Sequence, residues 1–264
     1  MSKTLGLALG GGCANGAAHA GVLRALEEAD IRPDYISGCS IGAVIGACYA
    51  HGMTALEIRE EVLKLKTRSI ADFRLGFIRR KSLFATKKVK KLLLKYIGDG
   101  TIEDLKIPFT CIATDAFNAK TVLLDKGPAV QAVLASLAVP GVFRPAELDG
   151  QTLIDGSVMC RVPSRYAKDM GADVVVSVDV LKNTENPPEK IKNIFSMLLR
   201  SYELMDLQIT RKTKELEKGI YDLYIEPDMT GLSQYTVKDL DITFDRGYEA
   251  GKAALPEIQR LLEG

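Results

Sequence analysis

A serine stands at the centre of the stretch Gly38-Cys39-Ser40-Ile41-Gly42, between a short apolar segment and a helix of small residues at 43–48. A serine at the tip of a tight strand-to-helix turn has a strained backbone, so the residues two positions away must be small. Gly38 and Gly42 meet that requirement. The helix that follows directs its N-terminal N–H groups at the hydroxyl, which favours a developing oxyanion. The pattern is typical of a nucleophile elbow, although a purely structural glycine turn has the same letters.

The chain offers no histidine where a serine hydrolase of the usual type needs one. A serine hydroxyl becomes a good nucleophile when a neighbouring base takes its proton. Only two histidines are present, and none follows position 51, which excludes the order serine, acid, histidine of the α/β-hydrolases. His19 is better explained as a helix residue that bonds a backbone carbonyl. His51 lies roughly 16 Å along a helix from Ser40, and a lysine at S-x-x-K spacing is missing because Ala43 holds that position.

Carboxylates at the ends of predicted strands are the remaining candidates for the base. Asp155 follows a predicted hairpin strand and precedes Gly156, whose small size lets this loop approach another closely. Asp115 is a weaker candidate, and Asp179 is best explained as structural. A turn or capping role is the alternative for Asp155. The residues alone therefore make Asp155 the best candidate and leave its role open.

Composition and charge narrow the class of protein. The 264 residues include 35 basic and 34 acidic side chains, which gives a net charge of +1. This balance does not indicate binding to nucleic acid or to an acidic partner. Five cysteines without a C-x-x-C pair argue against a disulfide framework or a zinc site, and we expect no metal and no cofactor. The first apolar stretch is too short for a signal peptide. No uncharged apolar stretch approaches the ~18 residues that a membrane-spanning helix needs. We expect a cytoplasmic protein.

Predicted strands alternate with predicted helices along the chain. The strands are expected at 4–9, 34–37, 109–114, 121–124, 148–154 (a hairpin), 172–179 and 221–225. The helices are expected at 17–29, 40–50, 54–65, 86–97, 127–137, 163–170, 188–218 and 244–262, the last interrupted at Pro256. This order predicts one α/β domain, 1–264, with a mainly parallel central sheet flanked by helices. The catalytic core spans about 4–180, and the C-terminal helices of 188–264 pack on it.

A basic segment at 74–95 interleaves arginine and lysine with phenylalanine and leucine. Within it, 86–97 reads as an amphipathic helix whose apolar side carries Val89, Leu92, Leu93 and Tyr96. We favour packing of that side on the core over contact with a membrane. A glycine loop at 10–12 suggests a dinucleotide site, but Asn15 stands where the third glycine of that motif belongs.

Four separated stretches resemble the patatin-like phospholipases, particularly their compact bacterial members, from Leu5 to about Asp179. They are the glycine loop 10–16 with 18–23 behind it, the serine elbow, 135–143, and Asp155-Gly156-Ser157 followed by Pro163. The resemblance implies a three-layer α/β fold and a Ser-Asp dyad without histidine. Ser40 would be the nucleophile and Asp155 the general base. It also implies an oxyanion hole formed by the backbone N–H groups of Gly11, Gly12 and Cys13.

Two loop positions depart from the family pattern. Cys13 stands where the family usually has glycine, and Asn15 where it usually has arginine or lysine. The backbone N–H donors of the loop are unaffected by either change, so the oxyanion hole is still expected. The loss of the positive side chain at position 15 makes a substrate with an anionic headgroup less favoured. The resemblance implies a serine acyl-ester hydrolase of lipid-type esters, like a phospholipase A or lysophospholipase. The alternatives are a thioesterase and a lipid- or partner-binding protein without activity. The basic segment at 74–95 is expected to allow peripheral contact with the inner membrane surface.

Overall fold

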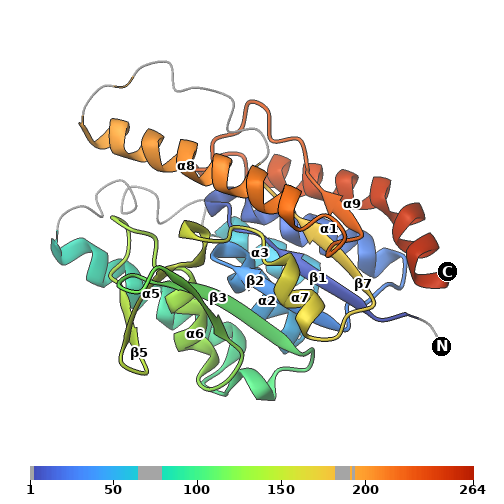
Figure 1. Cartoon of the computed structure of the whole chain (residues 1–264), viewed down its shortest axis with the longest axis horizontal. Helices are drawn as coiled ribbons and strands as arrows, with labels where there is room; N and C mark the ends of the chain where they lie inside the picture. The colour runs from blue at the N-terminus through green and yellow to red at the C-terminus, as the bar shows by residue number, and fades with distance from the viewer. Residues whose placement is uncertain (1–2, 65–78, 182–190, 192–193) are drawn as a thin grey trace.

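The computed structural model describes residues 3–64, 79–181, 191 and 194–264. The beginning of the basic segment, at 74–78, lies outside the described residues, as do the linker at 186–188 and the start of the helix predicted from 188. The described part of the chain forms one eight-stranded sheet with helices around it (Figure 1). This confirms the predicted fold class, a mainly parallel central sheet flanked by helices.

The strands were expected where they are found, to within a few residues. They are β1 (Leu5–Leu9), β2 (Tyr35–Cys39), β3 (Phe109–Asp115), β4 (Lys120–Leu124), β5 (Ala146–Leu148), β6 (Gln151–Asp155), β7 (Val174–Val178) and β8 (Leu223–Ile225). The sheet order is β5-β6-β3-β2-β1-β7-β8, and β4 pairs with β3. Neighbours among β3, β2, β1, β7 and β8 run parallel, whereas β4 and β6 lie antiparallel to β3 and β5 antiparallel to β6.

The α-helices include α1 (Ala17–Glu28), α2 (Ile41–His51), α3 (Ala55–Lys64), α5 (Arg79–Ile97), α6 (Ala129–Ser136), α7 (Ser164–Asp169), α8 (Ile194–Leu216) and α9 (Leu240–Glu263). Side chains alternate along β1, because successive residues of a strand point to opposite faces. Leu5, Leu7 and Leu9 enter the main core, and Ala8 enters a smaller core with Val162 and Ala167. The first face carries α1, α2, α6 and α9, and the second carries α7. The sheet is therefore the middle of three layers.

The register around β3 brings two distant chain segments together. Cys39, the last residue of β2, pairs with Ile112, and the next residue of β3, Ala113, pairs with Asp155 at the end of β6. The hairpin that delivers β6 turns through Asp149 and Gly150, both with positive φ, as the Asp-Gly sequence predicts. Ser40 and Asp155 therefore leave strands that meet the same short part of β3.

The predicted interruption at Pro256 is wrong, because α9 runs from Leu240 to Glu263 through that proline. Packing on both sides of Pro256 explains the continuity. Ile258, just beyond it, is fully buried. Before it, α9 crosses α1 so closely that a methyl group on Gly247 would lie 2.1 Å from the carbonyl oxygen of Ala18. The burial offsets the lost helix hydrogen bond, which costs about 3 kcal/mol in an exposed helix.

The basic helix α5 has the predicted faces. Leu93 is buried in the main core and Val89 and Tyr96 pack against it, while Lys87 and Lys91 are exposed. The favoured interpretation of 86–97, a solvated helix packed on the core, agrees with this arrangement. Among the described residues, no helix is both long enough and apolar enough to cross a bilayer.

Candidate active site

Ser40 occupies the turn between β2 and α2 with a strained backbone. Its φ of 53° and ψ of −121° lie in a region that residues with a side chain rarely adopt. The flanking glycines make the turn possible by close approach. A methyl group on Gly42 would lie 2.1 Å from the carbonyl oxygen of Leu9, and one on Gly38 would lie 2.5 Å from Ala43 Cα. These contacts give the turn the geometry of a nucleophile elbow.

The hydroxyl of Ser40 donates a hydrogen bond to Asp155, with 2.5 Å between Oγ and Oδ2. Both side chains are buried. The other carboxyl oxygen of Asp155, Oδ1, accepts the backbone N–H of Ser157 at 2.8 Å. This second bond holds the carboxyl group in place and leaves Oδ2 directed at the serine. The structure thus brings together the two residues that the sequence selected as nucleophile and base.

Helix α6 and the residues just after it hold both members of this pair. Ser136 Oγ accepts the backbone N–H of Ser40 at 2.8 Å, and the carbonyl of Ala138 accepts the backbone N–H of Asp155 at 3.0 Å. This role of Ser136 was not predicted. Ser136 belongs to the motif 135–143, but a buried serine that accepts a hydrogen bond from a distant amide has no signature in a single sequence.

Burial raises the pKa of Asp155 to about 6, against the opposing effect of the hydrogen bonds from Ser40 and Ser157. The carboxyl group is therefore ionised at neutral pH and has a much higher proton affinity than an exposed aspartate. A carboxylate with a pKa close to the working pH is well matched to general-base chemistry.

The glycine loop runs beside this pair, and one of its predicted donors is already used. The N–H of Gly11 donates to the carbonyl of Arg161 at 3.0 Å. The N–H groups of Gly12 and Cys13 have no acceptor among the described residues. A methyl group on Gly11 would lie 2.2 Å from Ser157 Oγ and 3.5 Å from Ser40 Cβ, so the loop packs tightly against the pair.

Cys13 and Asn15 have clear structural roles. Cys13 has a φ of 50°, in the left-handed region that favours glycine, and stands where the resemblance expects glycine. The buried Asn15 donates from Nδ2 to the carbonyl of Val180 at 3.1 Å, so it ties the loop to the chain after β7. His19 bonds the carbonyl of Gly10 through Nε2 at 2.7 Å, and burial lowers its pKa to about 4. The prediction that His19 bonds a backbone carbonyl is confirmed.

A buried ion cluster connects the site to α8. Arg161 bonds Asp179 at 2.8 Å and Asp206 of α8 at 2.5 Å, and all three side chains are buried. The carbonyl of the same arginine accepts from Gly11, so one residue joins α8 to the glycine loop. The structural role expected for Asp179 is confirmed, whereas the part played by Arg161 and Asp206 was not predicted.

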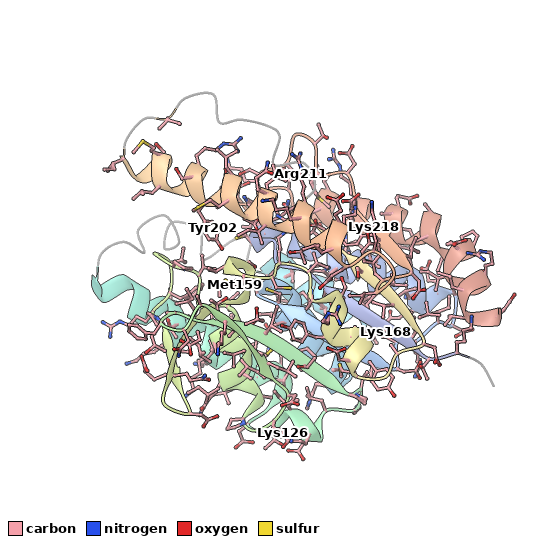
Figure 2. The ribbon with its side chains drawn as sticks, viewed as in Figure 1. Lys126, Met159, Lys168, Tyr202, Arg211 and Lys218 are labelled. Atoms are coloured by element: carbon pink, nitrogen blue, oxygen red, sulfur yellow. The ribbon has the colours of Figure 1, made fainter. Side chains whose placement is uncertain are left out.

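Tyr202 lies one turn before Asp206, on the side of α8 that faces the body of the molecule (Figure 2). Burial, followed by the carboxyl groups of Asp155 and Asp206, raises the pKa of its hydroxyl.

Cys39, the neighbour of Ser40, is fully buried with Sγ 3.3 Å from Ser157 Oγ, and burial raises its pKa well above the usual value. A thiol in that state is a poor nucleophile, so Cys39 does not compete with Ser40 for that role.

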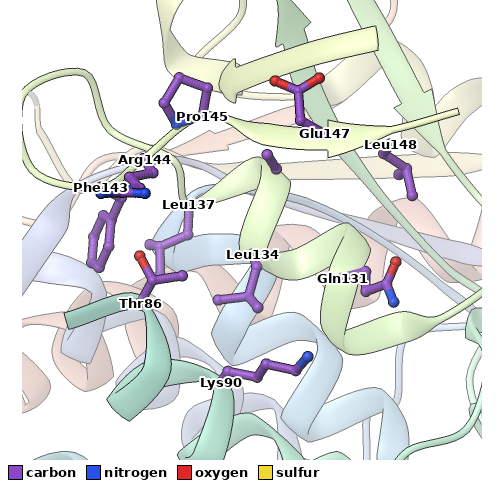
Figure 3. Close-up of a pocket in the computed structure, with 11 residues that line it drawn as sticks. Thr86, Lys90, Gln131, Leu134, Leu137, Phe143, Arg144, Pro145, Glu147 and Leu148 are labelled. Atoms are coloured by element: carbon purple, nitrogen blue, oxygen red, sulfur yellow. The ribbon is translucent and has the colours of Figure 1, made fainter. Parts of the chain in front are cut away.

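A pocket of about 420 Å³ lies between α6, α5 and the segment 143–148 (Figure 3), and neither Ser40 nor Asp155 is among its lining residues. Leu134 and Leu137 provide an apolar wall, Lys90 comes from α5, and Phe143 and Arg144 come from the loop before β5. Its volume is within the range of small-molecule sites.

Within 3–64, 79–181, 191 and 194–264, no group of three or more histidine, cysteine or acidic side chains has an arrangement that could hold a metal ion.

The chain is similar to several known proteins. The chain is 34% identical over 186 residues to an uncharacterized NTE family protein of Mycobacterium bovis, covering 70% of this chain and 51% of that protein. It is 29% identical over 280 residues to the lysophospholipase NTE1 of Coccidioides immitis, covering 97% of this chain and 18% of the fungal protein. The chain therefore spans about half the length of the mycobacterial relative and a smaller part of the fungal one.

Among solved structures, VipD from Legionella pneumophila superimposes with a TM-score of 0.56 at 15% identity, over 100% of this chain and 67% of that one. At this identity the likeness shows a shared fold. The model of the patatin-like phospholipase family matches residues 7–168, which contain the glycine loop, the elbow, the α6 motif and Asp155. By that match, the chain belongs to the patatin-like phospholipase family.

Proposed function

We propose that the protein hydrolyses acyl esters of lipids with a serine-aspartate dyad. The observation that carries the proposal is the hydrogen bond of 2.5 Å from Ser40 Oγ to Asp155 Oδ2, at the head of α2 and within a strained elbow. A buried pair of this kind has a chemical use, because the carboxylate can take the proton that the hydroxyl must lose to attack a carbonyl.

In the proposed reaction, Ser40 Oγ bonds to the carbonyl carbon of the ester as its proton passes to Asp155 Oδ2. The tetrahedral intermediate collapses, the alcohol leaves with the proton from Asp155, and an acyl-serine remains. Asp155 then takes a proton from water, which attacks the acyl group. Breakdown of the second intermediate returns the proton to Ser40 and releases the fatty acid.

The negative oxygen of each intermediate needs donors that are not already engaged. We assign this role to the N–H groups of Gly12 and Cys13, together with the positive end of α2. Gly11 belongs to the predicted set of donors, but its N–H is bonded to Arg161 in this conformation. Its part in the proposal is to keep the loop close to Ser40.

Lipid esters are the substrate class that the surroundings favour. The fungal relative is named a lysophospholipase, and the family is named for phospholipid hydrolysis. The pocket along α6, which the dyad does not line, combines leucine side chains with Lys90, Arg144 and Glu147, and its volume can hold part of an acyl chain. Contact of the described part of the basic segment, 79–95, with a membrane remains part of this proposal.

A fluorophosphonate probe tests the proposal directly. The probe forms a covalent phosphonyl bond with an activated serine, so we expect one adduct per chain, located at Ser40 by peptide mass spectrometry. Prior denaturation of the protein should remove the reaction. An intact protein that takes up no probe, or takes it up on another residue, would show that the elbow is not a nucleophile and would favour a lipid- or partner-binding protein.

The acyl donor is tested by ranking turnover on lysophospholipid, diacyl phospholipid and acyl-CoA. Ester cleavage in the lysophospholipid should be fastest if the relative's named activity extends to this chain. Preference for acyl-CoA would instead identify a thioesterase that uses the same two residues.

The pH dependence of kcat/KM should follow the ionisation of Asp155. The base acts only when deprotonated, and its pKa is about 6, so activity should fall about tenfold per pH unit below pH 6 and level off above it. A soluble nitrophenyl ester, assayed from pH 4.5 to 8.5 with a fold check at each end, gives the profile. A plateau that continues down to pH 4.5 would contradict this assignment.

A further inference from the structure

The outer face of α8 carries an apolar stripe that nothing in the described structure covers. Its members share one helix face and show 72, 47, 60, 46 and 58% of their surface: Ile194, Met197, Leu198, Leu204 and Met205. The spacings of three, four and seven residues place them in a continuous row. Exposed apolar groups in a contiguous patch mark a site of interaction, whereas single ones do not.

The polar residue inside the stripe is adapted to an apolar surrounding. Ser201 lies between Leu198 and Leu204, and its hydroxyl donates to the carbonyl of Met197 at 3.0 Å. This bond satisfies the hydroxyl within the helix, so Ser201 can leave water at little cost. The stripe is therefore apolar in effect along its full length from 194 to 205.

The same face becomes cationic toward the C-terminal end of the helix. Arg211 and Lys212 are exposed and stand seven residues after Leu204 and Met205, so they continue the row. The exposed Glu215 shares this face, and the three side chains together carry a net charge of +1. Apolar side chains followed by cations along one helix face match the two layers of an anionic lipid surface, the acyl region and the phosphate groups.

The inner face of α8 is attached to the catalytic machinery. Asp206 forms the ion pair with Arg161, whose carbonyl oxygen accepts the N–H of Gly11 in the glycine loop. The helix that carries the apolar row is thus connected to the glycine loop through one buried residue. A second copy of this chain is the alternative cover for the apolar row, since its carboxylates can also pair with Arg211 and Lys212. The oligomeric state distinguishes the two.

We propose that the outer face of α8 docks on an anionic lipid surface, with the apolar row among the acyl chains and Arg211 and Lys212 at the headgroups. This inference rests on the proposed function, because it places the dyad next to a layer of its lipid substrate. It adds α8 as a second surface for membrane contact, on a different helix from the described part of the basic segment, 79–95.

The test compares Leu198→Glu/Met205→Glu with the unaltered chain in sedimentation with vesicles of ether-linked phosphatidylcholine and phosphatidylglycerol. Ether lipids have no ester to cleave, so binding is measured without turnover. We expect partitioning to fall at least tenfold, while hydrolysis of a soluble nitrophenyl ester changes less than twofold. Phe117→Glu is the matched control, since Phe117 is 83% exposed in the turn between β3 and β4, and it should bind like the unaltered chain.

A second variant separates charge from apolar contact. Arg211→Glu/Lys212→Glu should lose binding to vesicles with phosphatidylglycerol and show little change with pure phosphatidylcholine. The inactive Ser40→Ala should bind as the unaltered chain does, so a failed activity assay and a failed docking assay can be told apart. Equal vesicle binding by all variants, or a change only in oligomeric state by analytical ultracentrifugation, would overturn the proposal and identify the row as a contact between copies.

Discussion

Replacing Ser40 by alanine should lower kcat for a soluble nitrophenyl ester by roughly 10³-fold or more. The substitution removes the only atom in the elbow that can bond to the substrate carbonyl, and Cys39 is too deeply buried to replace it. Fold and thermal stability should be retained, because alanine fits the space of serine and Ser136 can still accept the backbone N–H. Initial rates at saturating substrate, with circular dichroism as the fold check, make the comparison. Activity equal to that of the unaltered chain would contradict the proposed mechanism.

The Asp155→Asn variant should lose a similar factor and gain stability at neutral pH. Its amide can still accept from the N–H of Ser157 but cannot take the proton of Ser40. The carboxyl group of Asp155 has a pKa of about 6 in the folded protein against an ordinary value of 3.8. The unfolded chain therefore ionises first as the pH rises, and the cost of a buried charge appears between about pH 4 and 6 and persists above.

Thermal melts of Asp155→Asn at pH 4 and pH 8 test this sign. Relative to the variant, the unaltered protein should lose stability as the pH rises across that window. The difference at pH 8 should be on the order of a few kcal/mol, because a tenfold change in proton affinity corresponds to about 1.4 kcal/mol. The opposite result is that the stability of the variant relative to the unaltered chain falls between pH 4 and pH 8. That result would show that the folded protein stabilises the ionised carboxylate of Asp155.

Removal of the buried cation in Arg161→Met should destabilise the fold by about 3–5 kcal/mol. Asp179 and Asp206 then remain buried without their cation, and α8 loses its ion pair to the loop after β6. The cost arises from two uncompensated charges rather than from the loss of one contact. Urea denaturation followed by circular dichroism gives the change in free energy of unfolding.

Arg260→Met is the matched control for this prediction. Arg260 also bonds a carboxylate, that of Glu257, but both side chains are exposed, so the loss should be about 0–1 kcal/mol. The triple variant Arg161→Met/Asp179→Asn/Asp206→Asn should regain much of the stability lost by the single one, since no buried charge is left unpaired. Equal effects at Arg161 and Arg260 would show that the cluster does not act as a buried ion group.

Much of the Ser40–Asp155 pair could be predicted because each half has a local signature. A serine with glycines two residues away, and an aspartate before glycine after a hairpin, are patterns of the neighbouring residues. Their approach to each other is a matter of register, since β3 pairs with β2 through Ile112 and with β6 through Ala113. The family resemblance supplied that pairing, and periodicity alone did not.

The contacts that support the pair are not local, which is why sequence patterns missed them. Ser136 reaches an amide 96 residues earlier, and Arg161 reaches a carboxylate 45 residues later. Single side chains of this kind look like ordinary serine and arginine. The continuation of α9 through Pro256 was missed for a related reason, because the burial of Ile258 that stabilises it depends on tertiary packing.

The end of α6 holds the backbone of both members of the proposed dyad. The amide of Ser40 donates to Ser136 and the amide of Asp155 donates to Ala138, two residues apart. Exchange of either amide proton with solvent requires separation from this one turn, so both protons should exchange at similar rates, governed by a shared local unfolding event. A fluctuation that exposes the backbone of Ser40 should thus also release that of Asp155, so we expect the proposed site to open and assemble as a unit.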